Sequence, residues 1–155
     1  QKVLLMLDFD GYNRFDREEI REDSIRIAAY LSKKLLENGV PTGLVTNALE
    51  TGGQNRVETN CANGRNQYFA LLRAMARIET NRLSGSFCDL LDAAERNSGS
   101  TQYIVISSYA DKELDKRIFR LNSFGAGVSW IFLRDKARRI DYAPRSRVYL
   151  CEMEY

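Results

Sequence analysis

Two aspartates close the first apolar segment of the sequence. The run LLML at residues 4–7 leads directly into Asp8, Phe9, Asp10 and Gly11. A short apolar run followed by polar residues is typical of a buried strand, so both carboxylates are expected where that strand ends. A carboxylate pair can act as a nucleophile with its acid/base partner, or it can form half of a magnesium site. It can also cap loops and turns through local hydrogen bonds to the backbone.

The order of the segments predicts the fold that would position this pair. Apolar segments typical of strands alternate with segments whose apolar residues recur at helical spacing. This alternation predicts one α/β domain over residues 1–155, with a mostly parallel sheet and helices on both faces. The glycines of ETGGQN (50–55) predict that the next strand returns antiparallel, as a hairpin at the edge of the sheet. The expected strands are 2–8, 42–48, 56–60, 102–107, 127–133 and 147–153, and the expected helices are 16–39, 66–79, 86–96 and a stripe through Leu114, Ile118 and Leu121 that ends at Gly125.

Several polar residues are expected at one edge of this sheet. Ligands of open parallel sheets bind beyond the carboxyl ends of the strands, near the point where the strand order reverses. Asp8 and Asp10 follow the first strand, and Ser107 and Ser108 end the segment YIVISS. We expect residues 64–66, which open the second helix, at the same edge.

The composition excludes several kinds of chemistry. The sequence has no histidine, which rules out Ser-His-Asp and Cys-His nucleophiles and histidine-bound zinc. Its three cysteines form no C-x-x-C pair, which favours reduced thiols and an intracellular setting. The net charge of +2 gives no electrostatic argument for binding nucleic acid. No apolar run approaches the roughly 18 residues that indicate a membrane span.

One resemblance points to an enzyme. The segment LLMLDFDG resembles the first motif of the haloacid dehalogenase-like hydrolases, a hydrophobic strand followed by D-x-D-G. The resemblance implies that Asp8 attacks phosphorus, Asp10 acts as acid/base and Mg²⁺ offsets the charge. Ser107 would then bind phosphate, and Lys112 or Lys116 would act as the phosphate-binding lysine. Asp135 would be the late metal-binding acid.

A second resemblance is to von Willebrand factor A-type domains, which bind magnesium through D-x-S-x-S after the first strand. Asp8, Asp10 and Tyr12 stand at these three positions. The family adds a threonine before a later helix and an aspartate after the fourth strand. Alignment places Arg65 and Ser108 at these two positions. Of the five metal-binding positions, only Asp8 therefore has the residue type that the family has there. This pattern predicts a degenerate metal site.

A third resemblance covers most of residues 24–133. The order and spacing of its four segments resemble the carboxyl-terminal part of a bacterial family associated with MoxR ATPases, known as domain of unknown function 58. The segments are SIRIAAYLSKKLLENGVPTGLVTN (24–47), GRNQYFALLRAMARIE (64–79), QYIVISSYADKEL (102–114) and GVSWIFL (127–133). The family implies a von Willebrand A-like fold without established catalytic activity.

The same resemblance implies a cellular role. It predicts a non-catalytic module that binds a MoxR-type AAA ATPase during protein assembly. The expected location is the cytoplasmic side of the bacterial inner membrane, with the chain as the carboxyl-terminal piece of a longer, membrane-anchored protein. No cofactor is expected, although Mg²⁺ would bind if the site were intact.

A guanidinium can replace a metal ion between two carboxylates, because charge-assisted hydrogen bonds satisfy both. We therefore expect Arg65 to pair with Asp8 and Asp10. The predicted binding surface comprises Asp8, Asp10, Tyr12, Arg65, Asn66, Ser107 and Ser108. A basic stretch at residues 134–147, which contains Tyr142, meets either solvent, anionic lipid or an acidic partner.

Overall fold

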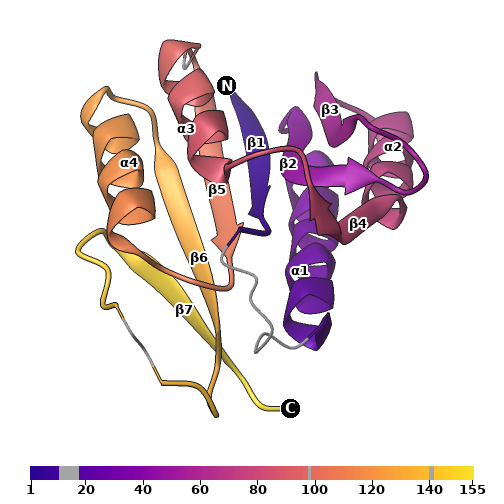
Figure 1. Ribbon diagram of the computed structural model, residues 1–155. Coiled ribbons are helices and arrows are strands. Elements are labelled where there is room, and N and C mark those ends of the chain that lie inside the picture. Colours follow the sequence, from indigo (N-terminus) through magenta and orange to yellow (C-terminus); the bar gives the residue numbers. More distant parts are fainter. Residues whose placement is uncertain (11–17, 98, 140–141) are drawn as a thin grey trace.

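The computed structural model describes residues 1–10, 18–97, 99–139 and 142–155. Within these residues, seven strands form one sheet with helices on both sides (Figure 1). The strands are β1 (Lys2–Asp8), β2 (Thr42–Glu50), β3 (Arg56–Ala62), β4 (Ile78–Leu83), β5 (Thr101–Ser107), β6 (Val128–Asp135) and β7 (Val148–Met153). The helices are α1 (Glu18–Glu37), α2 (Arg65–Ala76), α3 (Phe87–Arg96) and α4 (Lys112–Ser123).

The sheet is mostly parallel, in the order β3-β2-β1-β5-β6-β7. The chain leaves β1 toward β2 on one side and later returns to β5 on the other, so the strand order reverses between β1 and β5. The β2–β3 pair is antiparallel, which confirms the predicted edge hairpin. The predicted α/β fold class is therefore correct, and the acidic pair follows a strand at the reversal point.

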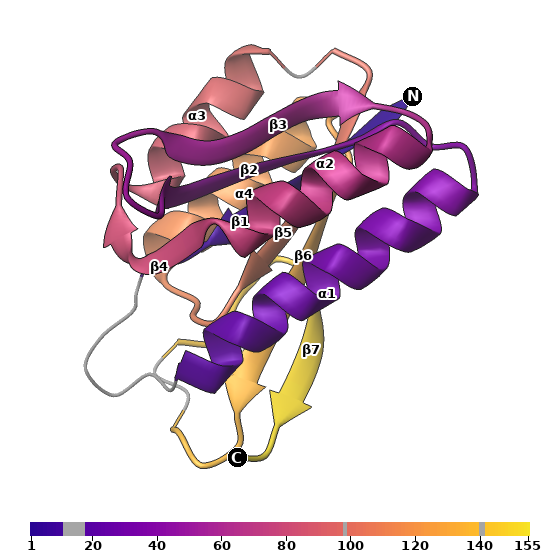
Figure 2. The same cartoon turned by 90° about the vertical axis from the view of Figure 1, so that its right-hand side faces the viewer.

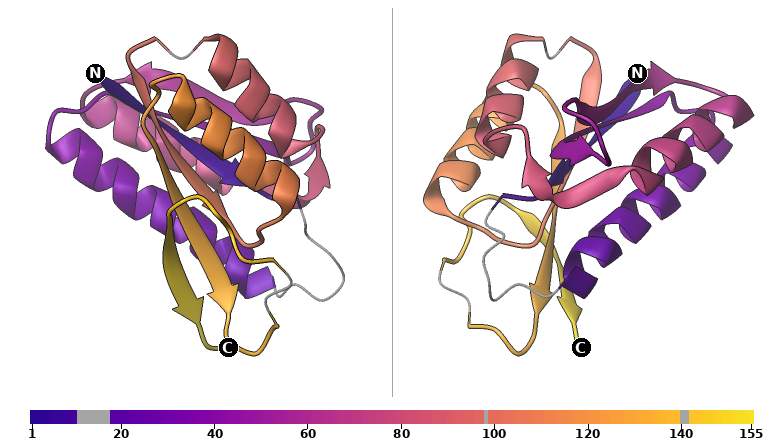
Figure 3. Two further views of the ribbon diagram at one scale, coloured as in Figure 1. Left: turned by 90° about the vertical axis from the view of Figure 1, so that its left-hand side faces the viewer. Right: turned by 45° about the vertical axis from the view of Figure 1, so that its right-hand side comes forward.

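Each face of the sheet is covered by two helices. In Figure 2, α1 and α2 lie in front of the sheet, and the left view of Figure 3 shows α3 and α4 on the opposite side. The two faces carry separate apolar cores, one around Leu5 and Leu71 and the other around Met6 and Leu114. Trp130 is fully enclosed in the second core.

The helix predicted over residues 66–79 is too long. It ends at Ala76, and residues 78–83 form the unexpected strand β4. Helical spacing also predicts that this helix buries Phe69, Leu72, Met75 and Ala76. This is partly wrong, because Met75 is buried but Phe69 is 43 % exposed and Ala76 is exposed. Local helical periodicity cannot show where an edge strand becomes available, because that depends on a partner distant in sequence.

β4 has a direct consequence for the acidic pair. Leu49 pairs with Arg56 of β3 and also with Glu79 of β4, so β4 lies on the side of β2 opposite β3. That is the side of β1, whose pairing with β2 ends at Leu7 and Thr46. β4 therefore continues the sheet beyond the end of β1 and delivers residues 84–86 next to the aspartates.

Candidate functional site

Asp8 and Asp10 lie together at the carboxyl edge of the sheet, as the sequence predicts. Asp8 is the last residue of β1 and is in register with Ser107 of β5. Its Oδ1 accepts a 2.8 Å hydrogen bond from the backbone N–H of Asp10. This local bond turns the chain out of the strand, the role that Asp residues often have where a strand ends.

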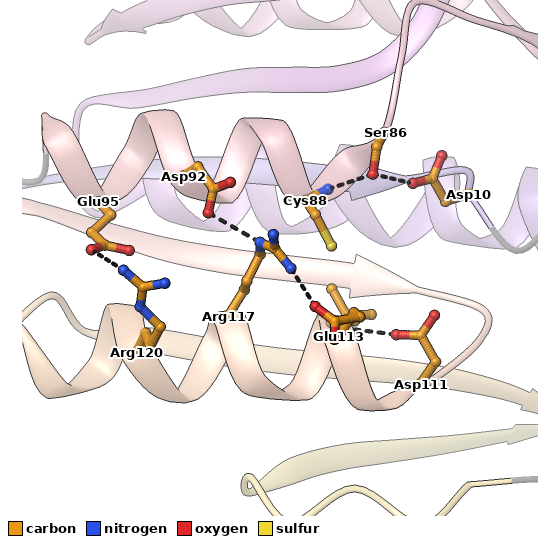
Figure 4. A network of polar contacts seen from close by, with 10 residues as sticks. Asp10, Ser86, Cys88, Asp92, Glu95, Asp111, Glu113, Arg117 and Arg120 are labelled. Carbon is orange, nitrogen blue, oxygen red and sulfur yellow. Dashed lines mark hydrogen bonds and ion pairs between the residues drawn. The ribbon is translucent and has the colours of Figure 1, made fainter.

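Asp10 joins β1 to the start of α3. Its Oδ2 accepts hydrogen bonds from the backbone N–H of Phe87 at 2.6 Å and from the Ser86 hydroxyl at 3.3 Å. The Ser86 hydroxyl in turn accepts from the N–H of Cys88, so Ser86 caps α3 while it contacts Asp10 (Figure 4). A carboxylate beside a helix N-terminus is stabilised by the unpaired N–H groups there. Asp10 therefore holds α3 against the end of β1.

Asn47, like Ser86 and Phe87, is a member of this site that was not predicted from the sequence. It is 1 % exposed in β2, and its Nδ2 donates to Oδ1 of Asp10 at 2.7 Å and to the Gly85 carbonyl at 3.3 Å. Its Oδ1 accepts from the N–H of Phe9 at 3.0 Å. An amide within the apolar run LVTNA was the available signal, because a buried polar side chain requires partners.

Asp8 has the most unusual environment in the site. It is 2 % exposed, and its Oδ2 has no hydrogen-bond partner among the described residues. Burial raises the pKa of Asp8 well above its ordinary value, and the charge of Asp10 raises it further. The N–H of Asp10 and the nearby Tyr109 side chain act in the opposite direction. The site therefore favours a neutral Asp8.

Two neighbouring groups are also poor nucleophiles. Burial raises the pKa of the Tyr109 hydroxyl far above its ordinary value, and the charge of Asp10 adds to the shift. Burial raises the pKa of the Cys88 thiol, although Arg117 opposes the shift. A reactive cysteine requires a lowered pKa. Neither group is therefore prepared for covalent catalysis.

Ion pairs tie α3 to α4 beside the site (Figure 4). Arg117 of α4 contacts Asp92 of α3 at 3.1 Å, and Arg120 contacts Glu95 at 2.9 Å. At the start of α4, Asp111 accepts from the N–H of Leu114 and caps the helix. Partly exposed ion pairs contribute only about 0–1 kcal/mol each. Their main effect is to fix the spacing between the two helices.

Most of the carboxylate oxygens of Asp8 and Asp10 are occupied by hydrogen bonds. Mg²⁺ requires a near-octahedral set of oxygen ligands. Both oxygens of Asp10 already accept hydrogen bonds, which leaves only Oδ2 of Asp8 without a partner. Within residues 1–10, 18–97, 99–139 and 142–155, no three His, Cys, Asp or Glu side chains lie close enough together to hold a metal ion. Tyr12, expected in the metal site, and Asp16, the first residue of the predicted helix 16–39, lie outside the described residues.

The residues expected to bind phosphate have other roles. The buried Ser107 hydroxyl donates to the Tyr109 carbonyl at 2.8 Å and accepts from the Trp130 indole at 2.9 Å. Ser108 follows it at the expected edge and is half-buried. Lys112 lines a groove on the outer side of α4. Asp135 is buried and accepts from the N–H of Ala137 at 2.9 Å. These contacts give the phosphohydrolase alternative no support.

The predicted pairing of Arg65 with Asp8 and Asp10 is wrong. β3 runs antiparallel to β2 and ends at Ala62, which is in register with Thr42. Thr42 in turn pairs with Val3, at the amino end of β1. Arg65 and Asn66 therefore start α2 at the end of the sheet opposite Asp8. The guanidinium of Arg65 lies over the Phe69 ring, 5.8 Å from its centroid.

If Arg65 paired with Asp8 and Asp10, the Arg65→Thr substitution would free the carboxylates and improve magnesium binding; the observed placement predicts otherwise. Because Arg65 is distant from the carboxylates, the variant should show the same response to Mg²⁺ as the parent protein. Its free energy of unfolding should change by less than about 1 kcal/mol, since an exposed side chain and one cation–π contact are lost. Urea unfolding with and without Mg²⁺ measures both quantities. Magnesium binding gained only in the variant would contradict the observed arrangement.

Comparison with known proteins identifies the fold. No protein-family model and no curated protein matches the sequence. The VWA domain of SpRpn10 is similar in structure, with a TM-score of 0.54 and 15 % identity over 99 % of this chain and 88 % of that one. A von Willebrand factor type A structure from Catenulispora acidiphila has a TM-score of 0.50 and 13 % identity, over 86 % of this chain and 33 % of that one. Similarity at these identities establishes the fold alone, and the fold is von Willebrand A-like.

Proposed function

We propose that the protein is a non-catalytic protein-interaction module of the von Willebrand A type, with a degenerate metal site. Its recognition surface would be the loop surface, defined here as residues 8–10, 84–86 and 107–111. The observation that supports this proposal is the use of Asp10: its carboxylate joins the end of β1 to Asn47 of β2 and to the start of α3 instead of facing a substrate. Loops held in one arrangement lose little entropy on binding, which favours recognition of a partner.

The proposed partner is a MoxR-type AAA ATPase. The support is the resemblance of residues 24–133 to the MoxR-associated family, together with the fold that this resemblance predicts. The proposed setting is the cytoplasmic side of the bacterial inner membrane, through segments beyond this chain. No helix among the described residues is long and apolar enough to cross a membrane.

A bulky substitution on the loop surface tests this function. Gly85 is suitable because a Cβ there would meet nothing closer than an Asp89 oxygen at 4.0 Å. The variant Gly85→Arg should therefore fold and block a partner that docks on the loops. We expect it to weaken binding to a purified MoxR-type ATPase by roughly tenfold or more in isothermal titration.

The matched control is Asn66→Arg, which adds the same charge to an exposed position at the opposite end of the sheet. It should bind the ATPase as the parent protein does. Equal binding by the parent and Gly85→Arg would contradict the loop surface as the docking site. Loss of binding in Asn66→Arg alone would move the docking site to the start of α2, and no binding by the parent protein would contradict the ATPase as the partner.

A further inference from the structure

A groove with cationic and aromatic walls lies on the outer side of α4. It has a volume of about 770 Å³ and runs between α4 and the segment that leads into β7. One wall comprises Lys112, Lys116 and Phe119 of α4, and the other comprises Tyr142 and Arg145. The volume is within the range of ordinary ligand sites, roughly 300–1,000 Å³.

The groove is held open by one buried carboxylate. Asp115, 4 % exposed, accepts hydrogen bonds from the Tyr142 hydroxyl at 2.8 Å and from the N–H groups of Arg145 and Ser146 at 2.7 and 3.0 Å. Burial raises the pKa of Asp115, but these bonds outweigh burial and the net pKa is lowered. The Asp115 charge is therefore used to fix the opposite wall.

The three cations of the groove are not neutralised by the described residues. Lys112 and Lys116 are four residues apart and share one face of α4. The nearby Arg117, Arg120, Arg134 and Lys136 all have carboxylate partners. In contrast, Lys112, Lys116 and Arg145 form no ion pair within the part of the chain that the structure describes. The groove therefore concentrates positive charge that remains available to a ligand.

Apolar surface accompanies this charge. The Phe119 side chain is 65 % exposed and lies in the same wall as the two lysines. The Tyr142 ring across the groove is fixed by its bond to Asp115. Exposed aromatic residues among cations are typical of protein-binding surfaces, where aromatic and Arg side chains supply most of the binding energy.

We propose that this groove binds an extended acidic segment of a protein partner. Carboxylates of the segment would contact Lys112, Lys116 and Arg145, and an aromatic or aliphatic side chain would pack on Phe119. The groove adjoins the loop surface where α4 begins but shares no residue with it, and it does not depend on the partner proposed for that surface. A peptide fits better than a membrane, because the cations line a concave surface and the whole chain carries a net charge of only +2.

The length of the groove defines the probe. Lys112 to Phe119 span roughly 10 Å of helix, the length of about three extended residues. A fluorescein-labelled peptide of alternating Glu and Asp with one central Trp, about eight residues long, covers this distance with margin. Fluorescence polarisation should show saturable binding that weakens as salt is raised. The same peptide with Lys in place of its acids should not bind.

Two pairs of variants locate the site. Lys116→Glu should weaken peptide binding roughly tenfold. The control Lys33→Glu makes the same charge change at an exposed position of α1, outside the groove, and should have little effect. Phe119→Ala should weaken peptide binding roughly fivefold, whereas Phe124→Ala, which removes an equally exposed ring (63 %) outside the groove, should not. Gly85→Arg should bind the peptide normally, so failure of the ATPase test and failure of this one remain distinguishable.

Four outcomes would overturn the proposal. One is the absence of saturable peptide binding, and another is equal weakening by Lys116→Glu and Lys33→Glu. A third is loss of peptide binding in Gly85→Arg, which would place the ligand on the loop surface. The fourth is binding to phosphatidylserine vesicles without binding to the peptide, which would make the groove a membrane contact.

Discussion

Replacing Asp10 by asparagine should lower the free energy of unfolding by about 2–4 kcal/mol. The carboxylate accepts hydrogen bonds on both oxygens: from Asn47 on one, and from Ser86 and the N–H of Phe87 on the other. Asparagine has a single acceptor oxygen, so its amide nitrogen would face either the Asn47 amide or the start of α3. Urea unfolding at neutral pH measures the loss, which should occur without a change in the m-value.

The control for this experiment is Asp89→Asn. Asp89 also lies in the first turn of α3 and is exposed, so the substitution removes the same charge from the same helix end. Its cost should be at most about 1 kcal/mol, the usual contribution of a charge near a helix end. If Asp10→Asn is no more destabilising than Asp89→Asn, Asp10 does not hold the loops together.

The second large effect is an increase in the free energy of unfolding, caused by a substitution of Asp8. Replacing Asp8 by asparagine should raise the free energy of unfolding at pH 8 by about 1–3 kcal/mol, because a buried, incompletely hydrogen-bonded carboxylate is costly when ionised. Asparagine keeps an oxygen that can accept from the N–H of Asp10. The variant therefore removes the charge and leaves the turn after β1 in place.

The pH dependence of this difference has a definite sign. Burial and Asp10 raise the pKa of Asp8 in the folded protein. The folded state therefore binds more protons than the unfolded state above the ordinary Asp pKa of about 3.9. The parent protein must lose stability relative to Asp8→Asn as the pH rises from about 4 through the folded pKa, and the loss stops above it. Urea unfolding of both proteins between pH 4 and pH 8 tests this, and a difference independent of pH would contradict a raised pKa.

Much of the fold was predictable because it depends on local patterns. The alternation of apolar runs and helical stripes correctly predicts the order of four helices and six of the strands. Glycine ends α1 and α4 as expected: Gly39 and Gly125 have φ angles of 74° and 83°, which favour glycine. The placement of Asp8 and Ser107 at one edge follows from the general geometry of parallel sheets.

The unpredicted parts depend on long-range pairing. The position of Arg65 depends on the direction of β3, which runs antiparallel to β2. The order of motifs along the sequence does not reveal this direction, so it placed Arg65 at the wrong end of the sheet. β4 forms because β1 ends and leaves one side of β2 available. The partners of Asp10 at Ser86 and Phe87 depend on this same strand. Ser86 and Phe87 are 76 and 77 positions from Asp10 in the sequence, so distant residues determine the hydrogen bonds of the acidic pair.

The central claim is that Asp8 and Asp10 stabilise the structure through hydrogen bonds and do not bind a metal ion. Titration of the protein with Mg²⁺ and Mn²⁺ tests this claim most directly. The free energy of unfolding is measured in chelator and in about 10 mM metal, for the parent protein and for Asp8→Asn. A site with a dissociation constant of 0.1 mM would add about 2.7 kcal/mol under these conditions. The account predicts no metal-dependent change in either protein. Stabilisation of the parent protein by metal, absent in Asp8→Asn, would contradict it and make Asp8 a metal ligand.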